Sequence, residues 1–450
     1  MDDVIARSAL AQSSLLRAGE LSVEALTSAY LVRIARLDGR LRAFTQLQPD
    51  RALSRARALD RVPVPERRGP LWGLPTAMKD LHLVRGTFTR LGSRAFRYLW
   101  TPLDDVSTRA VRRAGMVLTG KLATSELAIL PFIDTDLGPP TVNPWDPERY
   151  SGGSSGGSSA ALAAGMLPLA VASDGAGSIR IPAAFCGLVG HKPTRGLVPN
   201  PFARMENLGL SVLGPHARSV DDAAALLDAL VGDDAGVRFQ SAVERAPTGL
   251  RVRVTTRNPV VATDPEVAAC VERAARTLES LGHHVEEAEP FHGTIDEFLP
   301  MFCYLARGMF VPFEGLLQPA TRWLREQGRG VTLQAALERR ELFRQRVDQW
   351  FGETDLWLTP TVAVKPPRVG CWRDATPEGV FRGAAPLGAF TAVFNASGNP
   401  GTSVPLWPEG GGLPVGVQLV APRGQDVRAL AVARSLLEAL GTPLCPLAPG

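Results

Sequence analysis

The stretch SGGSSGGSSAALAA, residues 151–164, joins a run of serine and glycine directly to an apolar alanine and leucine segment. Such a run is often a flexible linker, but a linker joins two zones of different composition, and this run lies inside one. Trp145 and Tyr150 precede it, and serine and glycine suit a helix N-terminus, where free N–H groups point outward. The stretch therefore predicts a helix that begins within the run.

A second glycine-rich stretch, DGAGSIRIP, occupies residues 174–182. Each stretch places a serine, Ser154 in the first and Ser178 in the second, where the backbone carries almost no side chains. Neither stretch has the Lys-Ser, Lys-Thr or G-x-G-x-x-G pattern of a phosphate-binding loop. A hydroxyl beside unhindered N–H groups suits acyl transfer, because such N–H groups can hold an oxyanion.

Lysine is rare in this chain, since only Lys79, Lys121, Lys192 and Lys365 occur among 49 basic residues. Lys79 ends the mostly apolar segment 73–80, which predicts a buried strand. Burial lowers the pKa of an amine toward neutral pH, whereas a guanidinium stays charged. Lys79 is therefore the candidate general base.

Histidine is the more common partner of a serine nucleophile, so the histidines need to be weighed as well. They are His82, His191, His216, His283, His284 and His292. None of them lies in a G-x-S-x-G elbow, and neither does Ser178. A Ser-His-Asp triad through His82, three residues after Lys79, stays open as the alternative.

These motifs make the chain resemble the amidase signature family, which hydrolyses amides and related acyl compounds. The resemblance runs from about Leu21 to the C-terminal segment. It includes PTRG after Lys192, GPHARSVDD at 214–222 and GLPVGVQLV at 412–420. It implies an α/β fold with a large mixed, mostly parallel sheet flanked by helices on both faces.

The resemblance also implies roles for individual residues. Lys79, Ser154 and Ser178 correspond to the catalytic lysine, the serine after a cis peptide bond, and the nucleophile. Protons would pass from Ser178 through Ser154 to neutral Lys79. Asp174 and Arg180 would pair and support the second stretch. The expected oxyanion hole is formed by the backbone N–H groups of Gly175, Ala176, Gly177 and Ser178.

Ala176 departs from the usual family sequence, which is Asp-Thr-Gly-Gly-Ser. If this position requires a positive φ, alanine is strained there, and otherwise its methyl group only narrows the site. Lys121, Glu126 and Lys192 also fall at family positions. They are expected to be structural supports, with solvated surface charges as the alternative.

Composition limits the kinds of partner that this chain can have. Its net charge is +4, and no cluster of basic residues alternates with aromatics, which argues against nucleic acid. Residues 1–3 show neither the basic nor the apolar region of a signal peptide, so none is expected, and the longest apolar stretch, 160–172, is too short to span a membrane. Five scattered cysteines show neither zinc nor disulfide spacing. We expect a cytoplasmic monomer or homodimer with a small-molecule substrate, no metal and no cofactor.

Helical and strand patterns alternate along the chain, as in a layered α/β core. Helices are expected at 22–37, 107–114 and from Pro265 to Gly282, with Asp264 as the N-cap of the last one. Strands are expected before Lys79 and at 116–119, 250–256 and 284–286. Four segments follow from this pattern: an N-terminal helical segment (1–60), a core with the catalytic residues (61–240), a smaller α/β and helical lid region beside the substrate (241–355), and a C-terminal return to the sheet (356–450).

Two segments concentrate large apolar side chains and are candidate walls of a substrate pocket. The segment 297–318 contains Phe298, Met301, Phe302, Tyr304, Met309, Phe310 and Phe313, and the segment 127–140 contains Ile129, Leu130, Phe132 and Ile133. Ordinary core packing is the alternative. The residues chosen as pocket candidates are Ile129, Leu130, Phe132, Tyr304 and Phe310.

The expected activity is an amidase that cleaves apolar aryl or alkyl amides through an acyl-enzyme, with esters and carbamates as further substrates (a urethanase-type activity). A glutaminase subunit of a transfer-RNA-dependent amidotransferase is one alternative. A catalytically inactive binding or scaffold protein is the other. An apolar pocket argues against the first alternative, and the three intact catalytic positions argue against the second.

Overall fold

The computed structural model describes residues 1–200, 207–232 and 236–448. Within them, one sheet of 11 strands runs through the molecule in the order β1-β5-β2-β6-β8-β7-β12-β13-β11-β9-β10. The strands are β1 Phe44–Leu47, β2 Pro75–Lys79, β5 Val117–Leu122, β6 Leu169–Asp174, β7 Val189–Lys192, β8 Val212–Ala217, β9 Arg251–Val254, β10 His284–Glu287, β11 Leu356–Pro360, β12 Gly401–Leu406 and β13 Val415–Val420, and a separate pair is formed by β3 Thr87–Phe88 and β4 Trp100–Thr101. All four expected segments contribute strands to the large sheet, and their boundaries stay a prediction.

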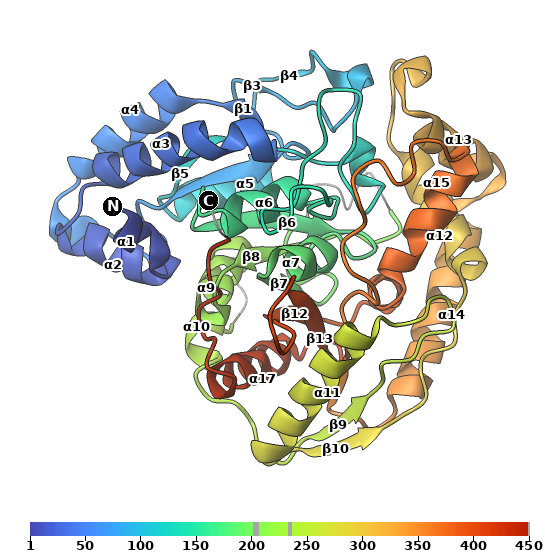
Figure 1. Ribbon diagram of the computed structural model, residues 1–450. Coiled ribbons are helices and arrows are strands. Elements are labelled where there is room, and N and C mark those ends of the chain that lie inside the picture. Colours follow the sequence, from blue (N-terminus) through green and yellow to red (C-terminus); the bar gives the residue numbers. More distant parts are fainter. Residues whose placement is uncertain (201–206, 233–235, 449–450) are drawn as a thin grey trace.

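Helices surround this sheet (Figure 1). They are α1 Asp2–Ala6, α2 Ala9–Ala18, α3 Val23–Leu41, α4 Pro49–Asp60, α5 Val106–Arg113, α6 Gly156–Ala163, α7 Arg180–Cys186, α9 Val220–Val231, α10 Phe239–Ala242, α11 Pro265–Ser280, α12 Ile295–Gly308, α13 Pro319–Gln327, α14 Leu333–Phe351, α15 Pro377–Ala384, α16 Ala392–Ser397 and α17 Asp426–Ala439. No helix in the described ranges is both long and apolar enough to cross a membrane.

Strand direction corrects one detail of the expected fold. The large mixed sheet flanked by helices is confirmed, but four strand pairings are parallel and six are antiparallel, so the sheet is not mostly parallel. The parallel pairings are confined to β5-β2-β6 and β11-β9-β10. Between them the direction alternates, because β8 and β13 each run antiparallel to both neighbours.

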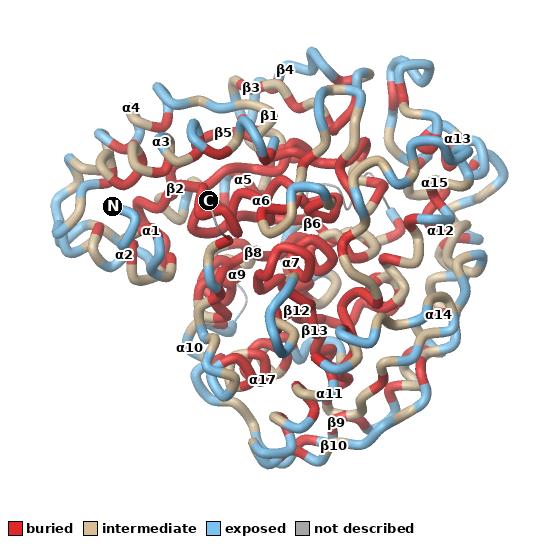
Figure 2. The backbone as a smooth tube through the Cα atoms, viewed as in Figure 1, coloured by how far each residue is buried: buried red, intermediate tan, exposed pale blue. Residues whose placement is uncertain are grey.

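Alternate residues of the strands pack on opposite faces of the sheet. Met78 and Val171 belong to a core that includes residues of α9 and α17, whereas Ala77 and Ala170 pack with α6 and the C-terminal half of α3. Each face therefore has its own helical cover. Figure 2 shows buried residues concentrated along the strands and in α6 and α7 at the centre of the molecule.

Most of the expected elements are confirmed within a few residues. The helix expected at 22–37 is α3, which begins after Ser22, whose hydroxyl accepts the N–H of Ala25. The helix expected after Asp264 is α11, and its N-cap carboxylate accepts the N–H of Glu266. The expected strands around 116–119, 250–256 and 284–286 are β5, β9 and β10.

The serine and glycine run does open a helix, α6, whose N-cap is Ser155. Gly157 shows why a glycine is needed within this run. A Cβ atom at this position would lie 2.5 Å from the Ala123 nitrogen and 2.7 Å from the Ala43 oxygen. The glycine therefore lets the first turn of α6 lie directly on the backbone of two neighbouring segments.

Candidate active site

Lys79 ends β2, and its side chain is fully buried. Its Nζ lies 2.7 Å from Ser154 Oγ, 3.0 Å from Ser155 Oγ and 2.9 Å from Ser173 Oγ. Burial lowers the pKa of Lys79 to about 7, and the more distant charge of Asp174 opposes that shift only in part. The amine is thus held by neutral hydroxyls and is substantially uncharged near neutral pH.

The three hydroxyls around Lys79 differ in where their own protons go. Ser155 Oγ donates to the carbonyl oxygen of Ser173 at 3.2 Å, so toward Lys79 it can only accept. A neutral amine has two N–H groups and one lone pair, and it needs one hydroxyl to donate to that lone pair. Ser154 and Ser173 are the two hydroxyls that can do so.

Ser154 and Ser178 line the same cavity, together with Ser173. Ser154 follows a cis peptide bond from Gly153 and is almost fully buried, whereas Ser178 is half-buried. A Cβ atom on Gly153 would lie 2.6 Å from the Phe132 nitrogen, so glycine is required for this close approach. The fold brings together the two serines predicted from the sequence, with Lys79 directly behind Ser154.

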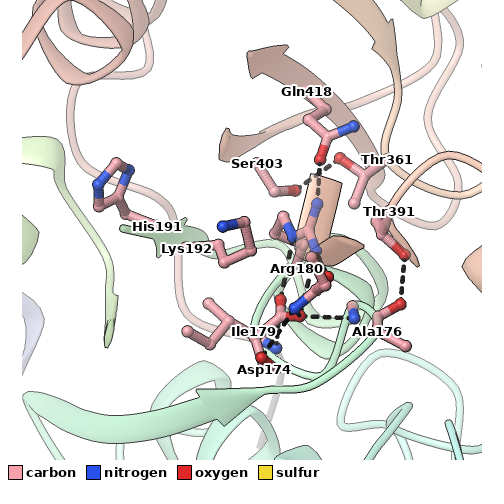
Figure 3. A network of polar contacts seen from close by, with 12 residues as sticks. Asp174, Ala176, Ile179, Arg180, His191, Lys192, Thr361, Thr391, Ser403 and Gln418 are labelled. Carbon is pink, nitrogen blue, oxygen red and sulfur yellow. Dashed lines mark hydrogen bonds and ion pairs between the residues drawn. The ribbon is translucent and has the colours of Figure 1, made fainter. Parts of the chain in front are cut away.

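The loop between β6 and α7 is supported by an ion pair from which water is excluded. Arg180 donates to both oxygens of Asp174, through Nε at 3.0 Å and Nη2 at 3.1 Å, and both side chains are fully buried. Figure 3 shows the Arg180 guanidinium between Asp174 and Gln418. Burial raises the pKa of Asp174, but Arg180 outweighs it and brings the pKa down to about 2. Asp174 therefore stays ionised, in agreement with the expected pair.

Two further residues of this network, Asn395 and Gln418, were not predicted as site residues. Asn395 Nδ2 donates to the backbone oxygen of Asp174 at 2.8 Å, and its Oδ1 accepts from Arg180 at 2.6 Å. Gln418 Oε1 accepts from Arg180 at 2.8 Å. Gln418 lies within the stretch 412–420 that carries part of the resemblance, which is a signal for it, whereas the sequence around Asn395 gives none. Ser155 and Ser173 were missed as well, although both adjoin predicted residues.

The backbone conformation of this loop shows whether Ala176 is strained. Ala176 has no positive φ, and it is Gly177 that adopts a φ of 132°. The Ala176 carbonyl accepts the Thr391 hydroxyl at 2.8 Å, so this peptide is held from outside the loop. The methyl group of Ala176 therefore causes no backbone strain and only narrows the cavity.

The N–H groups of the loop fall into two kinds. The Gly177 N–H donates to Asp174 Oδ1 at 2.6 Å, so it does not point into the cavity as expected for an oxyanion donor. In the described part of the chain, the N–H groups of Gly175, Ala176 and Ser178 have no protein acceptor. The Asp174 carboxylate, which also accepts the Ile179 N–H, removes one of the four expected donors.

The other charged candidates are buried in separate contacts. Lys121 pairs with Asp80 at 2.9 Å, and Glu126 accepts from Ser93 at 2.7 Å. Lys192 donates to the Pro193 oxygen at 3.0 Å, and burial lowers its pKa to about 7. Because these side chains are buried, they are not solvated surface charges.

His82 does not lie in the cavity lining, and its Nδ1 is 3.3 Å from Asp105 and 3.0 Å from Ser107. This geometry gives no support to a triad of His82 with Ser178. Among the described residues, no group of three His, Cys, Asp or Glu side chains is placed to hold a metal.

The cavity in front of the serines has a volume of about 140 Å³ and a mostly apolar wall. The two expected segments both contribute to it. The apolar lining residues from these segments are Leu127, Ala128, Ile129, Leu130, Pro131, Phe298, Phe302, Leu305, Ala306 and Met309. Ile129 and Leu130 thus lie where they were expected.

Phe132, Tyr304 and Phe310 do not line this cavity, which corrects the expected wall. Phe132 packs against Tyr150 and Trp372, with ring centroids 5.0 and 4.6 Å away. Tyr304 packs against a cluster that includes Met301 and residues of α14, and helical periodicity turns it away from Phe302 and Leu305, which line the cavity. Phe310 follows the end of α12 and is 80% exposed.

Known proteins are similar to this chain in sequence and in structure. The Amidase family model matches residues 25–311 and 312–430. AmiB2 of Mycobacterium tuberculosis is 37% identical to this chain over 96% of each. The solved structure of a 6-aminohexanoate cyclic dimer hydrolase with its substrate superimposes with a TM-score of 0.88 at 30% identity, over 97% of this chain and 98% of the other.

A second solved structure, that of a bacterial aryl acylamidase, superimposes with a TM-score of 0.85 at 25% identity over 96% of each chain. The family model covers most of the residues, and the sequence and structural similarities extend over almost the whole length. The chain belongs to the amidase signature family.

Proposed function

We propose that this amidase-family hydrolase cleaves apolar aryl or alkyl amides, with Ser178 as nucleophile, Ser154 as proton carrier and Lys79 as base. The observation that carries the proposal is the set of contacts around Lys79. In the described part of the chain, the hydrogen-bond partners of this fully buried amine are all hydroxyls, and at a pKa of about 7 it has a lone pair available for a proton.

In the acylation step, Ser178 Oγ attacks the amide carbonyl carbon. Its proton passes to Ser154 as the Ser154 proton passes to Lys79 Nζ, and the carbonyl π electrons move to oxygen. When the tetrahedral intermediate collapses, the C–N bond breaks, Ser154 protonates the leaving nitrogen, and Lys79 returns its proton to Ser154. The products are a free amine and an ester on Ser178.

In the deacylation step, water attacks the ester and loses its proton along the same path. The bond between carbon and Ser178 Oγ breaks, the acid leaves, and Ser178 regains a proton. The oxyanion of both steps is held by the N–H groups of Gly175, Ala176 and Ser178. Gly177 shapes this loop through its positive φ and its bond to Asp174.

The apolar cavity favours uncharged substrates with an aryl or alkyl group. Its volume of about 140 Å³ is close to the roughly 150 Å³ of an engineered apolar cavity that binds benzene. Carbamates and esters present the same carbonyl to the same relay, so they are further substrates of this site. The lining described by the structure contains no charged side chain, which disfavours glutamine and hence the amidotransferase alternative.

The proposal is tested with a fluorophosphonate probe and with a panel of anilides, carbamates, esters and glutamine. The wild-type protein is expected to be labelled and to hydrolyse apolar anilides, and Ser178→Ala is expected to lose both properties. Labelling that persists in Ser178→Ala contradicts the assigned nucleophile. Turnover of glutamine alone favours the amidotransferase alternative, and a folded protein without labelling or turnover favours the scaffold alternative.

A further inference from the structure

A second hollow lies beside the cavity of the candidate active site. It has a volume of about 100 Å³ and is enclosed by the loop after β9, by α12 and α14, and by the segment from α15 to α16. Figure 1 shows α12, α14 and α15 on one side of the molecule. We refer to it as the second chamber, and to the cavity lined by Ser154 and Ser178 as the first chamber.

The two chambers share one wall. The residues that line both of them are Phe298, Phe381, Ala385, Gly388 and Ala392. Three of these have no side chain larger than a methyl group, so the wall between the chambers is thin. The two aromatic side chains provide most of its bulk, and both belong to helices at the edge of the molecule rather than to the central sheet.

The second chamber is apolar, and each polar side chain in its lining already has a protein partner. Arg257, its charged residue, pairs with Glu289 at 3.0 Å. Asn258 donates to the Ala389 oxygen at 3.2 Å. The remaining polar side chains, Thr255, Thr294 and Thr359, are hydrogen-bonded to neighbouring residues. The rest of the lining consists largely of aromatic and aliphatic groups, including Phe291, Phe343, Trp350, Phe390 and Phe394. Such a lining suits a hydrocarbon and offers no free charge to a polar ligand.

The position of the chamber indicates which part of a substrate reaches it. The leaving nitrogen must lie near Ser154, whose preceding residue Gly153 packs against residues 130–132. The shared wall adjoins the loop that carries the nucleophile, since a Cβ atom on Gly388 would lie 3.3 Å from the Ala176 oxygen, and none of residues 127–131 lines the second chamber. The acyl group and the leaving nitrogen lie on opposite sides of the carbonyl carbon, which makes the shared wall the candidate contact of the acyl group.

We propose that the second chamber binds the distal end of the acyl group, and that the protein prefers amides whose apolar acyl group is too long for the first chamber alone. This inference rests on the proposed function, because it uses the assigned nucleophile and leaving-group side. The first chamber has room for about one aromatic ring, so a longer acyl chain must cross the shared wall, to which Phe298 and Phe381 belong.

The test compares 4-nitroanilides that carry acetyl, butanoyl, hexanoyl and octanoyl groups. In the wild-type protein, kcat/KM is expected to rise roughly fourfold for each methylene group that becomes buried. Val260, a half-buried loop residue that lines only the second chamber, is replaced in Val260→Trp to fill that chamber. The octanoyl-to-acetyl ratio of kcat/KM is expected to fall at least tenfold in this variant.

Phe310→Trp is the matched control, because it adds a similar ring at an exposed position outside both chambers, and its ratio should equal that of the wild type. Phe298→Ala thins the shared wall and should raise the ratio, which keeps the test decisive if Val260→Trp does not fold. Ratios that stay at the wild-type value in both chamber variants overturn the inference. If wild type is neither labelled by the fluorophosphonate nor active on any anilide, it is the proposed function that fails.

Discussion

Polar and apolar regions of the candidate active site are built in different ways. On the polar side, Lys79, Asp174 and Arg180 are fully buried, and each has several partners at hydrogen-bonding distance. On the apolar side, residues of α12 and α15 meet the cavity through non-directional contacts, and several are only partly buried. A polar group that loses its partner is left unsatisfied, whereas an apolar wall can repack. We therefore expect substitutions on the polar side to have the larger effects.

The largest effect on the polar side is expected from replacing Lys79, the proposed base. Lys79→Arg keeps a positive charge but has no lone pair to accept a proton, so kcat/KM for an apolar anilide is expected to fall by about 10²–10⁴-fold. Lys79→Met, which buries no charge, should lose as much activity and remain folded by circular dichroism. Lys365→Arg, at an exposed ion pair with Glu266, is the control and should keep wild-type rates. A wild-type rate in Lys79→Arg contradicts the relay.

Breaking the buried ion pair is expected to have the next largest effect, on stability. Arg180→Met leaves the Asp174 carboxylate buried without its partner, which should lower the free energy of unfolding by about 3–5 kcal/mol. The matched control is Arg434→Met, at the partly exposed pair with Asp221, where a change below about 1 kcal/mol is expected. Urea denaturation of both variants measures the difference. Equal losses at the two sites mean that the loop does not depend on this pair.

The dependence on pH follows from the lowered pKa of Lys79. The protonated amine cannot act as a base, so kcat/KM should be constant above pH 7 and fall about tenfold for each pH unit below it. Between about pH 7 and 10 the unfolded chain binds a proton at this lysine that the folded chain does not, so stability should rise with pH across that window. Lys79→Met should make the stability profile less steep there, and the remaining slope is expected from Lys192, whose pKa burial also lowers to about 7. A rate profile without an inflection near pH 7 speaks against Lys79 as the titrating group.

Changes on the apolar side should have the smallest effects. Leu305 lies over Gly175, where a Cβ atom would be 3.7 Å from the leucine side chain, and it lines the first chamber. Leu305→Ala is expected to raise KM for apolar anilides roughly three- to tenfold with little change in kcat. Phe310→Ala, at an exposed position outside the lining, should change neither parameter. A raised KM in Phe310→Ala together with an unchanged KM in Leu305→Ala would mean that Phe310, and not Leu305, lines the pocket.

The sequence predicts the polar side well because its chemistry is local. Ser154 and Ser178 are marked by glycines that the backbone requires, and Lys79 is marked by the scarcity of lysine and by its place at the end of an apolar segment. The structure brings these residues to one site. Their roles stay a prediction, as do the segment boundaries.

The apolar side could not be predicted residue by residue. A run of aromatic side chains in the sequence does not indicate which of them face a cavity. The aromatic side chains of α12 are in fact divided between the wall of the first chamber and the contact with α14. Phe310 was expected in the wall but follows the end of the helix, and the Gly177 N–H was expected in the oxyanion hole but bonds to Asp174. Both outcomes depend on local backbone geometry that the residue types alone do not fix. Asn395 was missed for a different reason, since its partner Asp174 lies about 220 residues away in the sequence.

The burial of three of the four lysines has a practical consequence for labelling. Lys79, Lys121 and Lys192 are inaccessible in the folded chain, so Lys365 is the lysine that an amine-reactive ester can reach. Attachment of a dye or a surface linker through a lysine is therefore directed to one position without any engineering. Acylation of a further lysine would report that the fold has opened.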